Sequence, residues 1–224
     1  MAAHGIEIPC DQRTDEWFRI RAGHLTGSRA KDALSVGKNG KPSAMRNRLI
    51  AELASTRYNP DIAIPTSAFV SGDMQWGIDQ EAAALSAYEE TVWQDRRELV
   101  RVATVGFLQH PDESLWCGCS PDGVVDGRLI ECKALASHNH LDILKRRAIP
   151  SHHLPQLRHN LFVSGEPVCD FVSYDPRLPD NAKIIVLPFT REDAKLDDYA
   201  QHVRDFMEEV DSAMQLMENF TRHG

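Results

Sequence analysis

A short predicted hairpin in the middle of the chain constrains the fold more than any other feature. Two apolar runs, 123–125 and 129–133, flank the dipeptide Asp126-Gly127. Asp-Gly between apolar runs favours a tight β-turn, because both residues tolerate a backbone with positive φ. The turn folds Asp122, which precedes the first run, back beside Glu131 in the second run. The sequence therefore places two carboxylates together on neighbouring strands.

Glu131 and Lys133 are predicted to share one face of their strand, since side chains alternate along a strand. Adjacent carboxylates repel and raise each other's pKa, and a bound divalent cation removes that penalty. Oxygen ligands suit Mg²⁺ or Mn²⁺. The lysine can then orient an attacking water or neutralise charge that develops on a phosphodiester. This pattern indicates metal-assisted phosphodiester hydrolysis; an ordinary Pro-Asp-Gly turn beside an exposed charge pair is the alternative.

The remaining pattern mixes helices and strands. Apolar runs indicate further strands over 99–108, 115–119, 169–174 and 183–188. Helices are expected over 15–21, 26–33, 43–55, 78–90 and 154–163, followed by a C-terminal amphipathic helix that begins between 192 and 196 and ends at 220. Hydroxyl residues at Thr26 and Ser43 are the expected caps, and Glu81, Leu85 and Tyr88 share a helical face. We expect one mixed α/β domain over 1–224.

Charge is distributed unevenly along the chain. The 224 residues carry a net charge of −8, which argues against a protein that coats nucleic acid indiscriminately. Residues 1–58 nevertheless hold ten Lys and Arg against six Asp and Glu, whereas residues 191–224 hold four against nine. An anionic ligand is therefore expected to meet the N-terminal part. The Gly-rich, basic loop over 35–43 is either a solvated connection or a flexible arm that touches a phosphate backbone.

Other sequence features exclude several classes of protein. The longest apolar runs are far shorter than a membrane span, and no secretory signal is seen, so we expect a cytoplasmic protein without membrane contact. Five cysteines, an odd number, fit reduced thiols. No Gly-rich loop precedes a Lys-Ser/Thr pair, so ATP hydrolysis has no support.

Histidine and cysteine residues offer a second, weaker candidate for a metal site. Cys117, Cys119, His152 and His153 would be its ligands, but the Cys-x-Cys spacing is unusual for zinc and two buried thiols explain it as well. Three further histidines are expected at the surface or beside DNA rather than as metal ligands: His138, His140 and His159.

The central motif resembles that of a known nuclease superfamily. Asp122, eight intervening residues and Glu131-Cys132-Lys133, with Pro121 before the aspartate, match the PD-(D/E)xK pattern. The chain from about Asp15 is further similar to the lambda exonuclease family of phage recombination nucleases, also called YqaJ-type viral recombinases. The matching segments are 17–21, 26–28, 76–81, 119–123, 131–133, 155–156 and 174–177. The resemblance implies a restriction-endonuclease-like core, in which helices flank a central mixed β-sheet, and a toroidal homotrimer.

The resemblance also implies roles for the central residues. Asp122, Glu131 and the backbone carbonyl of Cys132 match metal ligands, and Glu81 matches the acid that completes the site around a second metal. Lys133 matches the catalytic lysine. Gln156 matches the glutamine that places the water or the lysine, although the family's second glutamine is replaced here by Arg158.

The same resemblance implies contacts with DNA. Arg21 matches the arginine of a pocket for a 5′ phosphate, and Ser28 lies where a hydroxyl near a helix N-terminus donates to the same group. Met74 aligns with an apolar wedge that separates terminal base pairs, with a core methionine as the alternative. Lys38 aligns with a basic residue that reaches into the minor groove.

Taken together, the resemblance implies a Mg²⁺-dependent, processive 5′→3′ exonuclease on double-stranded DNA. Such an enzyme releases 5′-mononucleotides and leaves a 3′ single-stranded tail for a single-strand annealing protein, in a bacterial cell and encoded by a phage or prophage. A PD-(D/E)xK endonuclease of restriction or repair type is the first alternative. A non-catalytic relic that holds DNA ends is the second.

Overall fold

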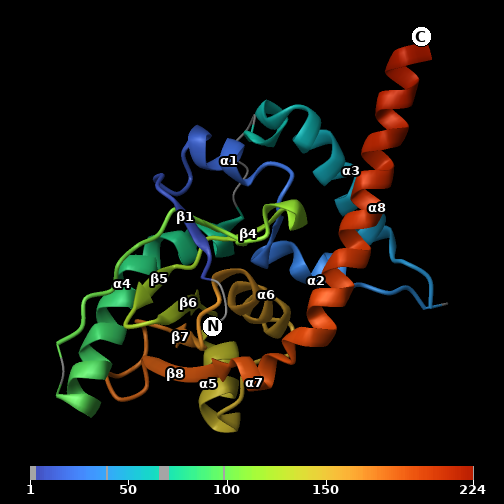
Figure 1. Ribbon diagram of the computed structural model, residues 1–224. Helices are drawn as coiled ribbons and strands as arrows, with labels where there is room; N and C mark the ends of the chain where they lie inside the picture. The colour runs from blue at the N-terminus through green and yellow to red at the C-terminus, as the bar shows by residue number, and fades with distance from the viewer. Residues whose placement is uncertain (1–3, 39, 66–70, 98, 224) are drawn as a thin grey trace.

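Two four-stranded sheets form the framework of the computed structural model, which describes residues 4–38, 40–65, 71–97 and 99–223 (Figure 1). The first sheet has the order β1 (Ile6–Ile8), β3 (Phe107–Gln109), β4 (Cys117–Cys119) and β2 (Leu25–Thr26). The second has the order β5 (Gly123–Val125), β6 (Arg128–Ala134), β7 (Val168–Tyr174) and β8 (Ile184–Thr190). Only β2 and β4, and β6 and β7, pair in parallel among these described strands. The predicted mixed sheet flanked by helices is confirmed, with its strands divided between two sheets.

Helices surround both sheets. They are α1 (Asp15–Arg21), the 3₁₀ turn η1 (Gly27–Arg29), α2 (Ala30–Ala33), α3 (Ala44–Tyr58), η2 (Pro60–Ala63), α4 (Gly72–Arg96), η3 (Glu113–Leu115), α5 (Ser137–Arg146), α6 (Leu154–Ser164), α7 (Arg191–Ala194) and α8 (Leu196–His223). The predicted α1, α3 and α6 are confirmed, and the Ser43 hydroxyl caps α3 by accepting from the Arg46 amide. The prediction for 26–33 is wrong in detail: Thr26 makes no side-chain cap, and a 3₁₀ turn precedes the short α2.

The central hairpin follows the sequence prediction closely. Asp126 and Gly127 have φ angles of 47° and 70°, as a tight turn between twisted strands requires. Gly123 is paired with Ile130 and Val125 with Arg128. β6 then runs parallel to β7, a connection that needs a long crossover, and the chain supplies α5 and α6 for it.

The second sheet is buried on both faces. Ile130 and Val172 pack with Tyr88 of α4, whereas Leu129 and Phe171, one residue earlier on each strand, belong to the core that includes α6. Successive side chains point to opposite faces, so alternate residues of β6 face different helices. Glu131 and Lys133 are in step with Leu129 and therefore point toward α6.

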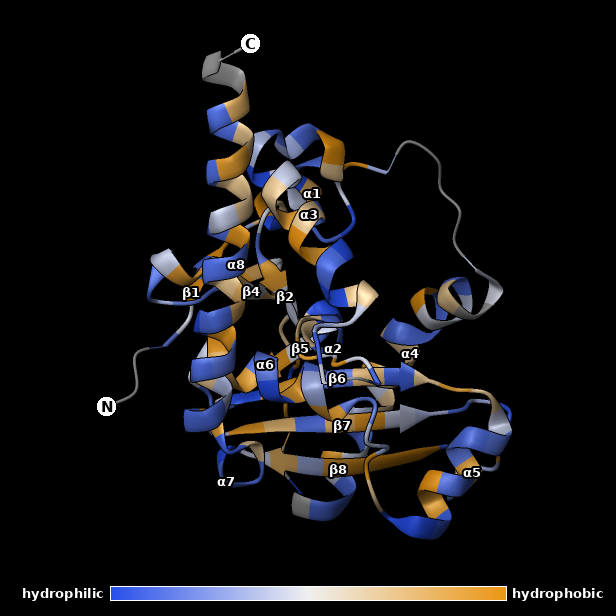
Figure 2. Cartoon of the chain, turned by 90° about the vertical axis from the view of Figure 1, so that its right-hand side faces the viewer, coloured by the Kyte–Doolittle hydropathy of each residue, from blue (hydrophilic) through white to orange (hydrophobic). Residues whose placement is uncertain are grey.

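The long helix α8 packs along α3 and then extends beyond the rest of the chain (Figure 1). Its apolar stripe, visible in Figure 2, is buried at Tyr199, Val203, Phe206 and Val210, as the sequence predicts. The expected C-terminal helix is interrupted at Lys195, whose φ of 47° separates α7 from α8.

Ion pairs join the basic N-terminal part to the acidic C-terminal helix. Arg46 pairs with Glu209 at 2.6 Å, and Arg57 pairs with Asp211 at 2.6 Å. Much of the N-terminal positive charge is therefore balanced within the chain, and less of it is free for an anionic ligand than its sequence count indicates.

Two strand predictions are corrected by the structure. Over 99–108 only the last residues join β3, and Ala103 forms a single bridge to Val124. The expected strand over 115–119 begins at Cys117, because Asp112 caps a 3₁₀ turn and Trp116 adopts a left-handed backbone with φ of 46°.

The basic loop over 35–43 is closed at its base. Val36 bridges to Pro42, and the amide of Gly37 donates to the carbonyl of Lys41 at 2.8 Å. Asn39 lies outside the described residues. Lys38 is exposed.

Two of the three histidines that the sequence analysis expected at the surface, His140 and His159, are buried. His140 bonds to Ser173 Oγ at 2.7 Å, and His159 lies between the Tyr199 hydroxyl and backbone carbonyls of the first sheet. Only His138 of the three is exposed, so the prediction is wrong for the other two. The expectation fails because each ring has polar partners from distant segments, which make its burial tolerable.

His159 gives the fold a predictable weakness in acid. Its Nε2 faces the carbonyls of Leu25 and Gly118, which only accept, so Nε2 carries the proton and Nδ1 accepts from Tyr199. Burial lowers the pKa of His159 to about 4. In the unfolded chain His159 takes up a proton near pH 6.5, whereas in the folded protein it does so only near pH 4. The free energy of unfolding therefore decreases as the pH falls from about 6.5 toward 4, by about 3 kcal/mol for this residue.

Urea unfolding at pH 7.5 and pH 5 tests this expectation with a His159→Gln variant. The variant is less stable at both pH values but should lose about 2 kcal/mol less than the wild type between pH 7.5 and pH 5. An exposed histidine, His138, replaced in the same way serves as the control. Equal losses in all three proteins would contradict the assignment.

No helix among the described residues is long and apolar enough to cross a lipid bilayer.

Candidate active site

A cavity of about 830 Å³ collects the predicted site residues. Its walls come from α1, η1, α4, β6 and α6 together with the turn between β4 and β5. The lining includes every predicted residue except Lys38: Arg21, Ser28, Met74, Glu81, Asp122, Glu131, Cys132, Lys133 and Gln156. Elements far apart in the sequence therefore bring these side chains into one space.

Glu131 and Lys133 form an ion pair inside the cavity, with Nζ 2.6 Å from Oε1. Burial alone would lower the pKa of Lys133, but the negative charges of Glu131 and Asp122 outweigh it and raise the pKa. The lysine is therefore a protonated cation at neutral pH. The shared strand face predicted from alternation brings the two charges together.

Two amides of α6 complete the surroundings of Glu131. Asn160 Nδ2 donates to Oε2 at 2.9 Å, and Gln156 Nε2 donates to Oε1, the oxygen that also receives Lys133. These residues are four apart on one helical face. Gly27 packs directly against them, and a β-carbon there would collide with Asn160 Oδ1. Gln156 therefore contacts the carboxylate, and Asn160 is a site residue that the sequence analysis missed.

Asp122 lies at the end of the hairpin, as predicted. Its amide donates to the Ile130 carbonyl at 3.0 Å, and its Oδ2 accepts from the Cys132 amide at 2.7 Å. Burial and the neighbouring charge of Glu131 raise its pKa well above that of an ordinary carboxyl. Burial and the neighbouring charge both disfavour the ionised carboxylate, and a bound cation would offset both effects.

Glu81 reaches the same cavity from α4, and its charge contributes to the raised pKa of Asp122. Arg13 forms an ion pair with Glu81 through Nη2 and Oε2. Arg13 precedes α1, and the sequence analysis gave it no role.

Arg21 lies in the cavity without an opposing carboxylate. Its guanidinium stacks 4.1 Å from the centre of the Trp17 ring and donates to Ser120 Oγ at 2.9 Å. Ser120 in turn donates to the Gly106 carbonyl at 2.7 Å. Arg21 forms no ion pair with any carboxylate of the described ranges, and burial lowers its pKa to about 10, which leaves it charged at neutral pH.

The other residues predicted to contact DNA differ in where they lie relative to the cavity. Ser28 is exposed in η1, with Oγ 3.4 Å from Thr26 Oγ1. Met74 is 62% exposed in the first turn of α4, so it is not a core residue. Lys38 lies in the loop, outside the cavity lining. Arg158 lies over the Tyr199 ring at 5.9 Å from its centre, on the side of α6 that meets α8.

The donor set fits hard divalent cations. The cavity brings carboxylates of Asp122, Glu131 and Glu81 to one region, and one of them, Asp122, has no cationic side chain bonded to it among the described residues. In the described ranges, no three His, Cys, Asp or Glu side chains lie close enough together to hold a metal. The carboxylates of Glu131 and Glu81 are instead occupied by Lys133 and Arg13. The alternative zinc site is not formed either: Cys117 and Cys119 are buried thiols that contact backbone carbonyls.

Comparison with known proteins identifies the family of this chain. The family model for the YqaJ-like viral recombinase domain matches residues 16–167, more than half of the chain. The chain belongs to the YqaJ-like viral recombinase family. The resemblance predicted from the sequence motifs is thereby confirmed.

Solved structures support the same assignment. The crystal structure of the alkaline exonuclease LHK-Exo from Laribacter hongkongensis is 28% identical, covers 94% of this chain and 99% of that chain, and has a TM-score of 0.77. The same protein in complex with dAMP gives a TM-score of 0.78 at the same identity and coverage. A phage-related exonuclease from Haemophilus somnus 129PT shares the fold, with a TM-score of 0.63 at 14% identity over 87% of this chain and 96% of that chain. No curated protein matches the chain. The family and these neighbours support a nuclease role.

Proposed function

We propose that the protein is a divalent-metal-dependent exonuclease that digests one strand of duplex DNA processively from its 5′ end. One observation carries the proposal: a cavity joins Asp122, Glu131 and Glu81 to a protonated lysine and to Arg21, which pairs with no carboxylate in the described part of the chain. The carboxylates and the lysine suit phosphodiester hydrolysis, and the arginine suits the binding of a terminal phosphate. The likeness to an alkaline exonuclease over nearly the whole chain supports the same activity.

The carboxylates would hold the metal. Asp122, Glu131 and the backbone carbonyl of Cys132 would bind one Mg²⁺ or Mn²⁺ ion, and Glu81 would complete the site for a second. Such ions lower the pKa of a bound water and stabilise charge on the phosphoryl oxygens. Asn160 and Gln156 fix the Glu131 carboxylate from α6, so this ligand is held in place before substrate arrives.

Lys133 acts in this proposal as a cation rather than as a base. Its pKa is raised, so it does not accept a proton at neutral pH. Its ammonium, directed by Glu131, can donate to the attacking water or to the phosphodiester as negative charge develops.

Arg21 supplies the end recognition. Stacking on Trp17 and donation to Ser120 direct the guanidinium, and without a carboxylate partner its charge is available to a 5′ phosphate. Ser28 at the cavity wall would add a hydroxyl, Met74 at the start of α4 would separate the terminal base pairs, and Lys38 would reach the minor groove from its loop.

The remaining features belong to the same proposal. Enclosure of DNA by a toroidal homotrimer would give processivity, and the 3′ tail would pass to a single-strand annealing protein. The chain would act in the cytoplasm of a bacterial host, encoded by a phage or prophage. A single mass corresponding to a monomer at working concentration would contradict the enclosure.

A linear duplex with a 5′ phosphate and a separate label on each strand tests the activity. With Mg²⁺, we expect 5′-mononucleotides from the phosphorylated strand only, an intact covalently closed circle, and no reaction in a chelator. Lys133→Ala should lower the rate at least about 100-fold, because it removes charge stabilisation in the transition state. Lys145→Ala, at an exposed position of α5, is the matched control and should cut normally.

Each alternative gives a different result in that experiment. Cleavage of the circle would indicate an endonuclease that uses the same Asp122, Glu131 and Lys133 chemistry. Binding of duplex ends without cleavage would indicate a non-catalytic protein that holds ends.

A further inference from the structure

Arg13 lines the cavity and contacts one of its carboxylates, but the proposed nuclease chemistry assigns it no task. Its ion pair with Glu81 joins the segment before α1 to α4, 68 residues later. The two side chains are 43% and 23% exposed, so both can exchange partners without unfolding of the core. Glu81 and Asp122 line the main cavity and also a second one, which Cys10 and Val105 help to form, so Glu81 lies on the boundary between the two cavities.

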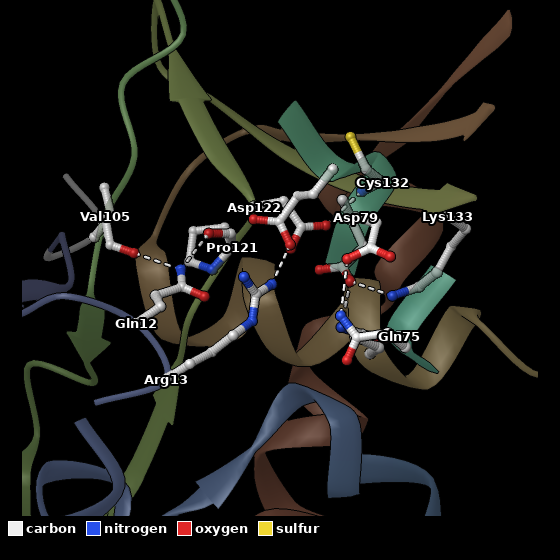
Figure 3. A network of polar contacts seen from close by, with 12 residues as sticks. Gln12, Arg13, Gln75, Asp79, Val105, Pro121, Asp122, Cys132 and Lys133 are labelled. Carbon is white, nitrogen blue, oxygen red and sulfur yellow. Dashed lines mark hydrogen bonds and ion pairs between the residues drawn. The ribbon is translucent and has the colours of Figure 1, made fainter. Parts of the chain in front are cut away.

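The neighbouring residue Gln12 holds the Arg13 segment in place. Gln12 Nε2 donates to the carbonyl of Val105 at 2.7 Å and to that of Pro121 at 3.2 Å, next to Asp122. Arg13 itself has a left-handed backbone with φ of 69°. Figure 3 shows Gln12 against Pro121 and Val105, with Arg13 directed toward the carboxylates around Asp122. The segment before α1 thus holds the Arg13 guanidinium next to the turn that carries Asp122.

Charge balance explains why a cation lies there. Glu131 is paired with Lys133 and Glu81 with Arg13, whereas Asp122 has no ion pair with a described residue. A metal ion bound to the same carboxylate would lie next to the Arg13 guanidinium, and the two positive charges would repel each other. Two cations of different kind therefore compete for one carboxylate.

We propose that Arg13 is an internal counter-ion that a divalent cation must displace from Glu81, so that Arg13 sets the affinity of the second metal position. The inference rests on the proposed function, because it requires that Glu81 bind metal. Removal of Arg13 raises the negative potential of the cavity and leaves Glu81 free, and both changes favour a divalent cation. For a partly exposed pair the effect is modest, about a two- to fivefold gain in metal affinity.

Direct binding of Mn²⁺, measured by titration calorimetry and by electron paramagnetic resonance of the free ion, tests the proposal without any cleavage. Arg13→Ala should bind the weaker of two Mn²⁺ ions about two- to fivefold more tightly than the wild type. Arg13→Lys, which keeps a cation beside Glu81, should stay near the wild type. Arg19→Ala is the matched control, since Arg19 forms an exposed ion pair with Asp61, which lies outside the cavity lining.

A double-mutant cycle assigns the effect to the pair. In a Glu81→Gln background, Arg13→Ala should raise Mn²⁺ affinity less than it does in the wild-type background, because the shared carboxylate is gone and only the loss of the positive charge remains. Unchanged or weaker Mn²⁺ binding by Arg13→Ala in the wild-type background would overturn the proposal. Failure of the proposed function looks different: the wild type would bind no Mn²⁺ at all, or Asp122→Asn would bind it as well as the wild type does.

Discussion

An Asp122→Asn enzyme is expected to lose at least about 1,000-fold in the rate of DNA cleavage while it becomes more stable to unfolding. The rate falls because a metal-ligating carboxylate contributes several kcal/mol to the barrier, and about 4 kcal/mol corresponds to three powers of ten. The fold is kept because an asparagine oxygen can still accept from the Cys132 amide, as Oδ2 of Asp122 does. The first measurement is the initial rate of nucleotide release in Mg²⁺.

The gain in stability follows from the raised pKa of Asp122, caused by burial and by the charge of Glu131. A carboxyl whose pKa is raised by folding contributes its stability at low pH and loses it as the pH rises above the ordinary value of about 4. At neutral pH the neutral amide removes that penalty, for a gain of about 0.5–2 kcal/mol in chelator. Urea unfolding at pH 5 and pH 8 measures it, and the advantage of the variant should be larger at pH 8.

Asp126→Asn is the matched control for this variant. It makes the same chemical change four residues away, in the exposed turn of the same hairpin, where asparagine also tolerates the φ of 47°. We expect normal cleavage and little change in stability. If the Asp122→Asn variant cleaves DNA normally, Asp122 is not a ligand in the proposed metal site. If this variant is less stable than the wild type at pH 8, the buried Asp122 carboxylate does not destabilise the fold.

Arg21→Ala is expected to abolish the preference for a 5′ phosphate over a 5′ hydroxyl. Charge-assisted hydrogen bonds contribute about 1.5–3 kcal/mol, so the wild type should favour phosphorylated ends by about 10- to 100-fold. The half-buried Arg21 guanidinium is directed by Trp17 and Ser120 and has no carboxylate to neutralise it in the described part of the molecule. Initial rates on matched duplexes that differ only in the 5′ group measure the preference.

Two further variants make this result specific. Arg19→Ala, on the same helix and paired with Asp61, should keep the preference. Arg21→Lys should keep part of it, because an ammonium retains the charge but not the fork of a guanidinium. A phosphate preference that persists in Arg21→Ala would assign the terminal phosphate to another group.

The half of the site that the central hairpin forms is readable in the sequence because it is local. The Asp126-Gly127 turn sets the register of the hairpin, and strand alternation then places Glu131 and Lys133 together. Turn geometry and a period of two are encoded within a dozen residues, so no distant contact is needed to predict them. The amphipathic stripe of α8 and the Ser43 cap are local in the same sense.

Tertiary structure alone decided which partners hold those groups. Asn160 meets Glu131 from 29 residues away, Arg13 meets Glu81 across 68, and Arg21 meets Ser120 across 99. The burial of His140 and His159, against the surface positions expected, likewise depends on carbonyls and hydroxyls of other elements. A single polar residue in a sequence carries no period and no turn signal, so its partner is fixed only when packing brings the two segments together and a buried group must find a hydrogen bond.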